Sequence, residues 1–565
     1  MDRSPHDGTK KPRARKRLCG APAHVISVPL RATPAQMATV VTRLEASRRV
    51  YNACLGEAMS RCAAMHADPG FEEAKKLPKG PPRSKEAAAR REAFVALAEL
   101  HRFTRSDLQS YGSSLRHAFV REGVGAQEAQ VLGARAFDAT DRWSKRLAGK
   151  PRFKSVRRGL RSARTKDLCG DMAPILDKRG APLGIRWAGL PLALAPLPGH
   201  PSSRAHRDAR AERQRLEEAI ASGALLQMQV VRTIIRGRPT LRAQFVVDGR
   251  APVRHKVGDG RVSIDTGPSD IYVVTEDAAG EPVPGGCGRR KLAPGVVHPS
   301  AELRRLQRRL DRQHRAGSPS CFDDKGCHKK GGCDWKVRSK RAQATEQEIA
   351  ELHRRIAACR TSEHGKLAND IVELGRDHRF ERLNYLTWQK KFPRSVRDRA
   401  IGAFMEKLAR KAENAGGSVY PYSPYTTALS QTCVCGKRER KPLSQRHHRC
   451  ACGAEAQRDL FSSYLGLHVA PVETADGNLD LLDQEGAAAA LAAFAPYLQE
   501  AGDSSWSMGA ADKRRVRRRR PPGRRSLVRI RARHKRSTDA KETLGDNPDE
   551  RRSMRPLPGK ALVAA

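Results

Sequence analysis

The sequence predicts a multidomain α/β protein, and three observations support this fold class. Amphipathic helical patterns fill most of residues 33–148. Short apolar strands separated by turns follow between residues 172 and 249. Residues 261–275 then form two apolar strands joined by a glycine turn, and long charged helical patterns come after them. A chain of 565 residues has room for several domains, each with a core of its own.

The charge balance points to a polyanionic partner. Lys and Arg number 108 against 61 Asp and Glu, which gives a formal net charge of +47. The fourteen cations between Lys513 and Arg536 make up less than a third of this excess, so the rest is spread over the chain. Such a field attracts nucleic acid from a distance, and it favours a large nucleic-acid-facing surface over a solvated basic surface without a partner.

Cysteine content and hydropathy indicate the compartment. The thirteen cysteines are an odd number, and the sequence has no signal peptide and no apolar run of about 18 residues. We therefore expect an intracellular protein of a reducing compartment, with no membrane segment.

The N-terminal region begins with a basic arm and a helical bundle. Residues 1–22 carry a run of Lys and Arg with no hydrophobic segment behind it, which predicts a flexible arm. Residues 25–30 predict a strand, and Thr33-Pro34-Ala35-Gln36 is a capping box that opens a helix with an apolar face through Leu55. Further helices are expected over residues 88–101, 106–121 and 126–148.

A cation-rich segment and a β-rich module follow the bundle. Residues 149–158 place five cations around Phe153. Strands are then expected over residues 183–187, 190–192, 226–231 and 241–247, with a polar helical connector at 201–222. This pattern indicates a small β-barrel-like module, and a basic β-domain without a partner fits the same residues.

Two close cysteine pairs form the most specific motif of the chain. Fourteen residues separate Cys433 and Cys435 from Cys450 and Cys452, and a glycine follows each pair. Four thiolates can surround one zinc ion as a tetrahedron, and the glycines permit a tight turn at each pair. We therefore predict a structural zinc site rather than four buried free cysteines.

A looser cysteine group lies between two charged helical patterns. It consists of Cys321, Cys327, His328 and Cys333. Because these residues lack the paired spacing of a zinc knuckle, we favour unpaired loop cysteines over a second metal site.

Three carboxylates could serve hydrolytic chemistry. Asp265 ends an apolar strand before a glycine turn, Glu381 lies among charged residues in a later strand, and Asp459 follows the second cysteine pair. Each alone is typical of a turn or a solvated surface. Strands can bring distant carboxylates together, and such hard ligands can hold two Mg²⁺ ions about 4 Å apart for phosphodiester cleavage.

The ordered set of motifs resembles the TnpB/OrfB family of transposon-encoded RNA-guided nucleases and their descendants, the type V CRISPR effectors. The resemblance covers roughly residues 24–468. In chain order, the matching motifs are Arg48-Arg49-Val50-Tyr51-Asn52, Pro151-Arg152-Phe153-Lys154-Ser155, Ile264-Asp265-x-Gly267, Phe380-Glu381-Arg382-Leu383-Asn384, Ser430-Gln431-Thr432-Cys433, the cysteine pairs and Arg458-Asp459.

The resemblance implies a fold, cofactors and partners. The fold is a helical recognition bundle, a small β-barrel (wedge) module and an RNase H-like RuvC domain with an inserted zinc ribbon. Catalytic magnesium is implied at Asp265, Glu381 and Asp459, and structural zinc at the four paired cysteines. The implied partners are a guide RNA and double-stranded target DNA, bound by a monomer or a homodimer on one RNA, in the bacterial cytoplasm near the nucleoid. The candidate nucleic-acid contacts are Arg48, Arg49, Asn52, Arg152, Lys154, Arg157 and Arg158.

The expected domain boundaries follow from these assignments. In chain order they are a basic arm (1–22), the wedge start with the helical recognition region (23–171), the β-barrel-like wedge module (172–258), the RuvC-like nuclease domain with a helical insert (259–425), the zinc ribbon (426–456), the third RuvC-like motif (457–470) and a basic, largely disordered tail (471–565).

The expected activity is RNA-guided, Mg²⁺-dependent cleavage of DNA by an endonuclease. Glu373 competes with Glu381 for the middle acidic role, and we favour Glu381 because Glu373 falls on a helical segment that ends at Gly375. The third motif has Gln457 and Phe461 where the family usually has Asp and Asn. The alternatives are therefore a guided DNA-binding repressor that cuts poorly, or a transposon-associated accessory protein labelled as a transposase.

Overall fold

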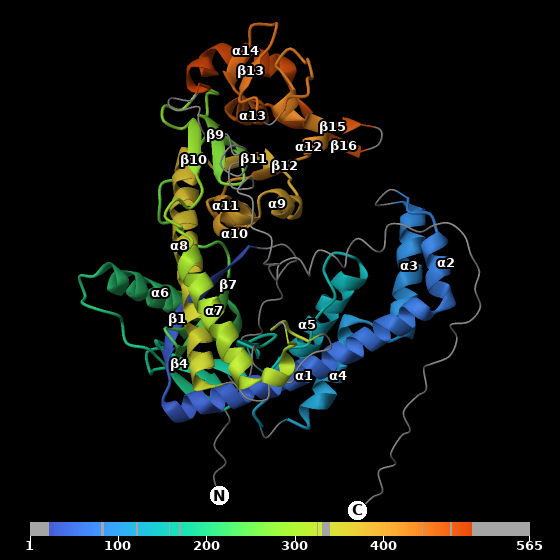
Figure 1. Cartoon of the computed structure of the whole chain (residues 1–565), viewed down its shortest axis with the longest axis vertical. Coiled ribbons are helices and arrows are strands. Elements are labelled where there is room, and N and C mark those ends of the chain that lie inside the picture. Colours follow the sequence, from blue (N-terminus) through green and yellow to red (C-terminus); the bar gives the residue numbers. More distant parts are fainter. Residues whose placement is uncertain are drawn as a thin grey trace, which may run out of the picture. The chain divides into compact units, whose positions relative to one another are not determined.

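The computed structural model describes residues 22–80, 84–119, 122–156, 159–168, 171–324, 326–329, 339–442, 444–474 and 477–499. Arg157, Arg158, Cys333 and nearly all of the predicted basic arm lie outside the described residues, as do residues 500–565 of the predicted tail. Figure 1 shows the sheets and helices described below.

The first sheet has seven antiparallel strands in the order β2-β6-β7-β1-β5-β4-β3. Its strands are β1 (Ala23–Arg31), β2 (Ser162–Arg164), β3 (Met172–Leu176), β4 (Pro182–Trp187), β5 (Leu190–Leu194), β6 (Leu225–Ile235) and β7 (Arg238–Asp248). No ladder joins the edge strands β2 and β3 in the described chain, so the predicted barrel-like module is an open, curled half-barrel. Helix α6 (Arg204–Ala221) packs Leu216 into the same core.

The helical region comprises α1 (Pro34–Ala67), α2 (Pro69–Lys76), α3 (Lys85–Leu100), α4 (Arg105–Arg116) and α5 (Ala126–Ser144). The predicted capping box is present, because Thr33 Oγ1 accepts from the amide of Gln36 at 3.2 Å while the Gln36 side chain accepts from the amide of Thr33 at 2.8 Å. Helices α4 and α5 cross closely at Gly133, where a β-carbon would collide with the carbonyl of Leu108.

A buried carboxyl group joins the helical region to the first sheet. Glu128 on α5 is 1% exposed, and its carboxyl accepts from Ser47 Oγ of α1 at 2.5 Å and from Trp187 Nε1 of β4 at 3.3 Å. Burial raises the pKa of Glu128 to about 7. The neutral acid fits these neighbours well, because it can donate to Ser47 Oγ while that hydroxyl donates to the carbonyl of Arg43.

The second sheet has five strands in the order β10-β9-β8-β11-β12. These are β8 (Arg261–Thr266), β9 (Asp270–Glu276), β10 (Gly288–Lys291), β11 (Asp377–Glu381) and β12 (Val419–Tyr422). Strands β8, β9 and β10 are antiparallel, whereas β11 runs parallel to both β8 and β12. The two parallel pairs mean that β8 and β11 have their carboxyl ends at the same edge.

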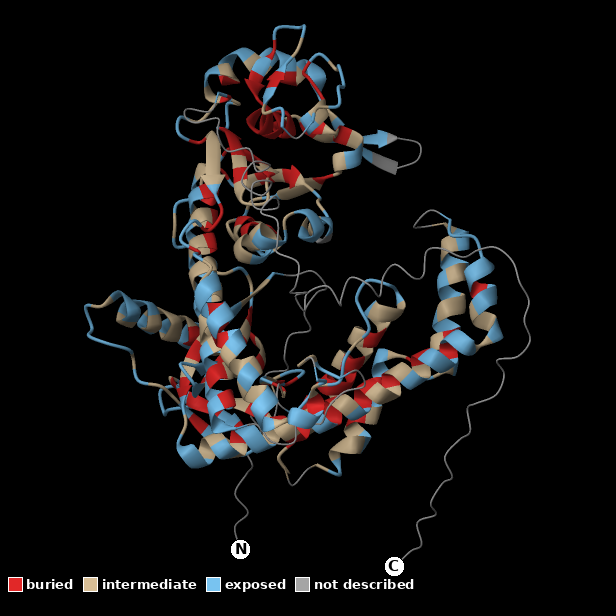
Figure 2. Cartoon of the chain, viewed as in Figure 1, coloured by how far each residue is buried: buried red, intermediate tan, exposed pale blue. Residues whose placement is uncertain are grey.

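Each face of this sheet is covered by helices. One face packs Val262, Ile264 and Phe380 against α8 (Lys340–Leu374) and α11 (Ile401–Asn414). The other face is covered by α13 (Arg458–Leu467), which is buried along its whole length (Figure 2). Because side chains alternate along a strand, Ser263 and Asp265 lie on the α13 face. The remaining helices of this part are α7 (Ser300–Gly317), η2 (Pro319–Cys321), α9 (Tyr385–Lys391), α10 (Pro393–Arg399), α12 (Pro424–Thr427) and η3 (Leu429–Gln431).

Folded structure continues past residue 470, where the sequence pattern predicted the tail to begin. A hairpin of β15 (Val469–Thr474) and β16 (Gly477–Leu482) is followed by α14 (Gln484–Phe494) and η4 (Ala495–Tyr497). Phe494 and Leu498 are fully buried in the core that contains α13. The alanine-rich sequence of α14 carries few large apolar residues that would indicate a contact with a core. No helix of the described chain is both long and apolar enough to cross a membrane.

Replacing Leu498 should show that this terminal segment stabilises the second sheet. Leu498→Ala removes a fully buried side chain and should lower the free energy of unfolding by about 2–5 kcal/mol. Leu481→Ala is the matched control, because Leu481 is 40% exposed and should cost much less. Denaturant unfolding measures both, and equal losses would contradict the burial of Leu498.

Replacing Glu128 should change how stability depends on pH. A carboxyl group with a raised pKa keeps its proton in the folded state, so its contribution to stability is full below about pH 4.5 and is lost as the pH rises through 7. Glu128→Gln mimics the neutral acid, so at pH 8 it should be more stable than the parent by at most roughly 3 kcal/mol. The exposed Glu99→Gln serves as the control. A difference between Glu128→Gln and parent that stays constant from pH 4.5 to 8 would rule out the raised pKa.

Candidate functional site

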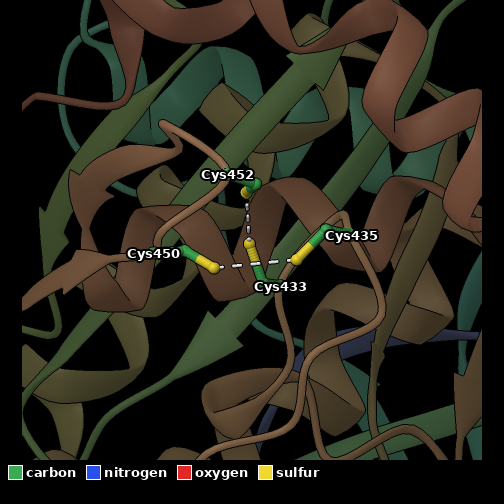
Figure 3. A group of neighbouring side chains, drawn as sticks. All are labelled: Cys433, Cys435, Cys450 and Cys452. Carbon is green, nitrogen blue, oxygen red and sulfur yellow. Dashed lines mark hydrogen bonds between the residues drawn. The ribbon is translucent and has the colours of Figure 1, made fainter.

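The four paired cysteines form a compact cluster. The Sγ atoms of Cys433 and Cys452 are 3.5 Å apart, those of Cys435 and Cys450 are 3.6 Å apart, and all four lie within 4.8 Å of one another (Figure 3). These separations are far longer than a disulfide bond. They are close to the edge of about 3.8 Å that a tetrahedron of thiolates has around zinc at about 2.3 Å. The cluster could therefore bind a metal ion such as zinc.

The backbone around the cluster explains the glycine after each pair. Gly436 and Gly453 have φ of 79° and 92°, in the left-handed region. Their amides donate to the carbonyls of Cys433 and Cys450, each at 3.0 Å, so the two knuckles turn in the same way. Burial raises the pKa of the Cys433 thiol, whereas hydrogen bonding to the backbone of Cys452 lowers the pKa of Cys450 to about 7.

The second cysteine group does not form a comparable cluster. Cys321 is disulfide-bonded, so it is not the unpaired loop cysteine that its spacing predicted. Cys327 is free and half-buried, and Cys333 lies outside the described residues. In the described part of the chain, the four paired cysteines are the only group of three or more ligands whose donor atoms lie this close together.

Asp265 and Glu381 lie at the carboxyl ends of neighbouring parallel strands. The register pairs Ile264 of β8 with Phe380 of β11, so the next residue of each strand is one of the two carboxylates. Both side chains are on the face covered by α13. The rival Glu373 is exposed on α8, a helix on the opposite face of the sheet. The topology thus brings together Asp265 and Glu381.

The segment with the second cysteine pair leads directly into the helix that carries Asp459. A short hairpin of β13 (His447–Arg449) and β14 (Glu455–Gln457) contains the second cysteine pair, and α13 begins at the next residue. Gln457 caps this helix, because its Oε1 accepts from the amide of Leu460 at 2.6 Å. Asp459 is therefore in the first turn of α13, on the same side of the sheet as the other two carboxylates.

Burial, and at Asp265 also repulsion from neighbouring carboxylates, raises the proton affinity of Asp265 and Glu381. The pKa of Asp265 is well above its usual range, chiefly because of burial and then because of the charges of Asp459 and Glu381. Burial raises the pKa of Glu381 to about 7. Burial, and then the charges of Glu381 and Asp265, raise the pKa of Tyr422 well above its usual range. Three crowded hard oxygen ligands of this kind suit a divalent cation such as Mg²⁺, although their oxygens are not as close together as the cysteine sulfurs.

The carboxylate of Asp459 accepts hydrogen bonds from two arginines and a glutamine. Arg458 donates to Oδ1 through Nε at 3.1 Å and Nη2 at 3.0 Å. Arg446, from the loop between the cysteine pairs, donates to Oδ2 at 3.1 Å, and Gln457 Nε2 lies 3.4 Å from the same oxygen. Neither Arg446 nor Arg458 was predicted as a site residue. For Arg446, the only signal in the sequence was the positive charge of the loop.

The two motifs expected to bind nucleic acid contact each other. The side chain of Asn52 on α1 accepts from the amide of Lys154 at 2.8 Å and donates to its carbonyl at 2.9 Å. Arg48 donates to the same carbonyl at 2.9 Å and pairs with Glu45, while Arg49 pairs with Glu122 at 3.2 Å. This arrangement leaves Phe153 58% exposed beside the exposed Arg152.

One comparison with known proteins concerns the segment that contains the cysteine pairs and Asp459. Residues 402–464 match the family described as Cas12f1-like, TNB domain, and this range includes all four paired cysteines and Asp459. The match confirms, for this part of the chain, the resemblance to the TnpB and type V group. No curated protein matches the chain.

Two solved structures are similar to the chain. One is described as a cryo-EM structure of the Cas12f1-sgRNA-target DNA complex, at 11% identity and a TM-score of 0.37, and the match covers 78% of this chain and 98% of that chain. The other is described as a cryo-EM structure of a CRISPR-Cas12f ternary complex, at 12% identity and a TM-score of 0.23, covering 76% of this chain and 81% of that chain. Neither TM-score is high enough to establish a shared fold.

Removing one cysteine should release the metal. Cys450→Ser replaces one of four clustered thiolates, so the zinc content measured by elemental analysis should fall from one ion per chain towards zero. The thermal unfolding temperature should fall with it. Cys359→Ser removes a half-buried free cysteine outside the cluster and should leave both values unchanged. Equal zinc in the two variants would show that the cluster is not the zinc site.

Proposed function

We propose that this chain is an RNA-guided DNA endonuclease with a RuvC-like active site built from Asp265, Glu381 and Asp459. The observation that carries the proposal is the placement of these carboxylates on one face of one sheet, with the third carboxylate inside a Cas12f1-like domain. The mixed sheet, in which three antiparallel strands are followed by two parallel ones, is compatible with the RNase H-like fold of such nucleases.

The three carboxylates would hold two Mg²⁺ ions. When bound, these ions supply a hydroxide nucleophile at neutral pH and stabilise the charge on the leaving oxygen. Asp265 and Glu381 offer ligands from rigid strand ends, and Asp459 offers a third from the first turn of a buried helix. The raised pKa values of Asp265 and Glu381 reflect the repulsion and burial that a cation would relieve.

A guide RNA and double-stranded DNA are the proposed partners. The net charge of +47 favours long polyanions. In this class of enzyme, base pairing with the guide reads sequence, while the protein contacts the backbone and a short flanking motif. Arg152 and Phe153, held in place by the contacts of Asn52 with Lys154, are candidates for nucleic-acid contacts. We expect one or two chains per RNA and a location in the bacterial cytoplasm.

The cysteine cluster is proposed to be a structural zinc ribbon. Its second knuckle runs through β14 into α13 without a break, so a bound ion would fix the start of the helix that presents Asp459.

A specific observation favours the second candidate, a guided DNA-binding protein that cuts poorly. Both oxygens of Asp459 are already engaged by arginines, and Gln457 stands where the resembling family usually has a further aspartate. An Asp459 that stayed paired with arginine would weaken metal binding while leaving guided DNA binding intact.

RNA sequencing and a cleavage assay separate these candidates. The protein is expressed with its native flanking DNA, the co-purified RNA is sequenced, and the complex is tested on DNA that carries the matching target. We expect one defined RNA class with a variable end and Mg²⁺-dependent cleavage. Asp265→Asn should reduce cleavage at least about 100-fold, because outer-shell changes alone cost 10–100-fold, and it should leave DNA binding unchanged.

Each outcome decides between the candidates. Random cellular RNA would overturn the guided mechanism. A defined RNA with target binding but no cleavage by the parent protein would establish the repressor instead.

A further inference from the structure

We propose that Arg379 is a positioning residue that fixes the helix carrying Asp459 against the strand carrying Glu381. The proposal rests on the proposed function, since it concerns the metal site of the three carboxylates. Arg379 lies on β11, two residues before Glu381, so both side chains are on the face covered by α13.

Arg379 holds the carboxyl end of α13. Its Nη1 donates to the carbonyl of Leu467 at 2.7 Å and to that of Val469 at 2.5 Å. The last carbonyls of a helix have no partners within the helix, and they carry its partial negative charge. The half-buried guanidinium of Arg379 therefore forms one charge-assisted hydrogen bond with the last carbonyl of α13 and a second with the first residue of β15, the strand that follows the helix.

A second polar anchor fixes the middle of the same helix. Ser463 Oγ lies 2.9 Å from the carbonyl of Ser263 on β8 and 3.1 Å from that of Tyr272 on β9. Because the register pairs Ser263 of β8 with Arg379 of β11, both anchors contact the sheet at the same position along these neighbouring strands. Asp459 lies one helical turn from Ser463, towards the amino end of α13. Asp265 lies two residues from Ser263 along β8. The two steps are of similar length, about 6 Å each.

These anchors fix the position of α13 along its own axis, relative to the sheet. The apolar contacts of Leu460, Phe461 and Leu465 hold the helix onto the sheet, but apolar packing is non-directional and tolerates small displacements. The hydrogen bonds of Arg379 to the carbonyls of Leu467 and Val469 do not tolerate such displacements. Without Arg379, the helix would keep its core contacts and the Ser463 anchor, but its carboxyl end would be free to shift, and the carboxylate of Asp459 would be held less closely at its distance from Glu381.

The test compares metal affinity among substitutions at Arg379. Arg379→Met keeps a long apolar stem and removes both hydrogen bonds, whereas Arg379→Lys keeps the charge and can restore only part of them. Arg360→Met is the matched control, because Arg360 also donates to a main-chain carbonyl, that of Arg397, at 3.0 Å. Asp265→Asn defines the signal of the acidic site. Full-length protein is titrated with Tb³⁺, a hard cation detected by luminescence, and thermal unfolding is recorded in parallel.

We expect Arg379→Met to bind Tb³⁺ at the acidic site 10–100-fold more weakly than the parent, with Arg379→Lys intermediate and Arg360→Met unchanged. The Mg²⁺ concentration that gives half-maximal cleavage should rise by a similar factor. A purely structural role would lower the unfolding temperature of Arg379→Met without this shift in metal affinity, and that result would overturn the proposal.

Failure of the proposed function gives a different result. If Asp265→Asn bound Tb³⁺ as the parent does, the three carboxylates would not form a metal site, and the role of Arg379 would fall with it. If Asp265→Asn lost the signal but Arg379→Met kept the parent affinity, only the inference about Arg379 would be wrong.

Discussion

Electrostatic repulsion among three carboxylates is the constraint that the rest of this part of the chain must satisfy. Asp265, Glu381 and Asp459 come from three segments, and their surroundings favour the neutral forms of Asp265 and Glu381. Packing of α13 supplies the opposing free energy, because every residue of this helix is buried. The arginines that contact Asp459 reduce the net negative charge of the three carboxylates.

The cysteine cluster and the carboxylates form one continuous structural unit. The chain passes from the first knuckle through the basic loop to the second knuckle, and then through β14 into α13. Arg446 of that loop reaches Asp459 directly. The cysteine cluster proposed to bind zinc and the aspartate proposed to take part in hydrolysis are thus separated by a single short strand, so a fixed second knuckle would also fix the start of α13.

Sequence reasoning located the residues whose signals are local. The cysteine knuckles, the capping box at Thr33 and the strand-end position of Asp265 all follow from short patterns. It missed features that depend on contacts between distant segments, such as the bonds from Arg379 to carbonyls about 90 residues later. Phe494 was missed as a core residue because its helix is mostly alanine, and Cys321 because spacing alone does not reveal a disulfide.

The contact between Asn52 and Lys154 fixes the position of the segment around Lys154 without depending on the side chains of that segment. Asn52 and Arg48 hold only the amide and carbonyl of Lys154, groups that almost every residue possesses. The neighbouring side chains, Arg152 and Phe153, are exposed and take no part in these bonds. Substitutions at Arg152 and Phe153 can therefore change the surface that this segment exposes without removing the contacts that hold its backbone in place.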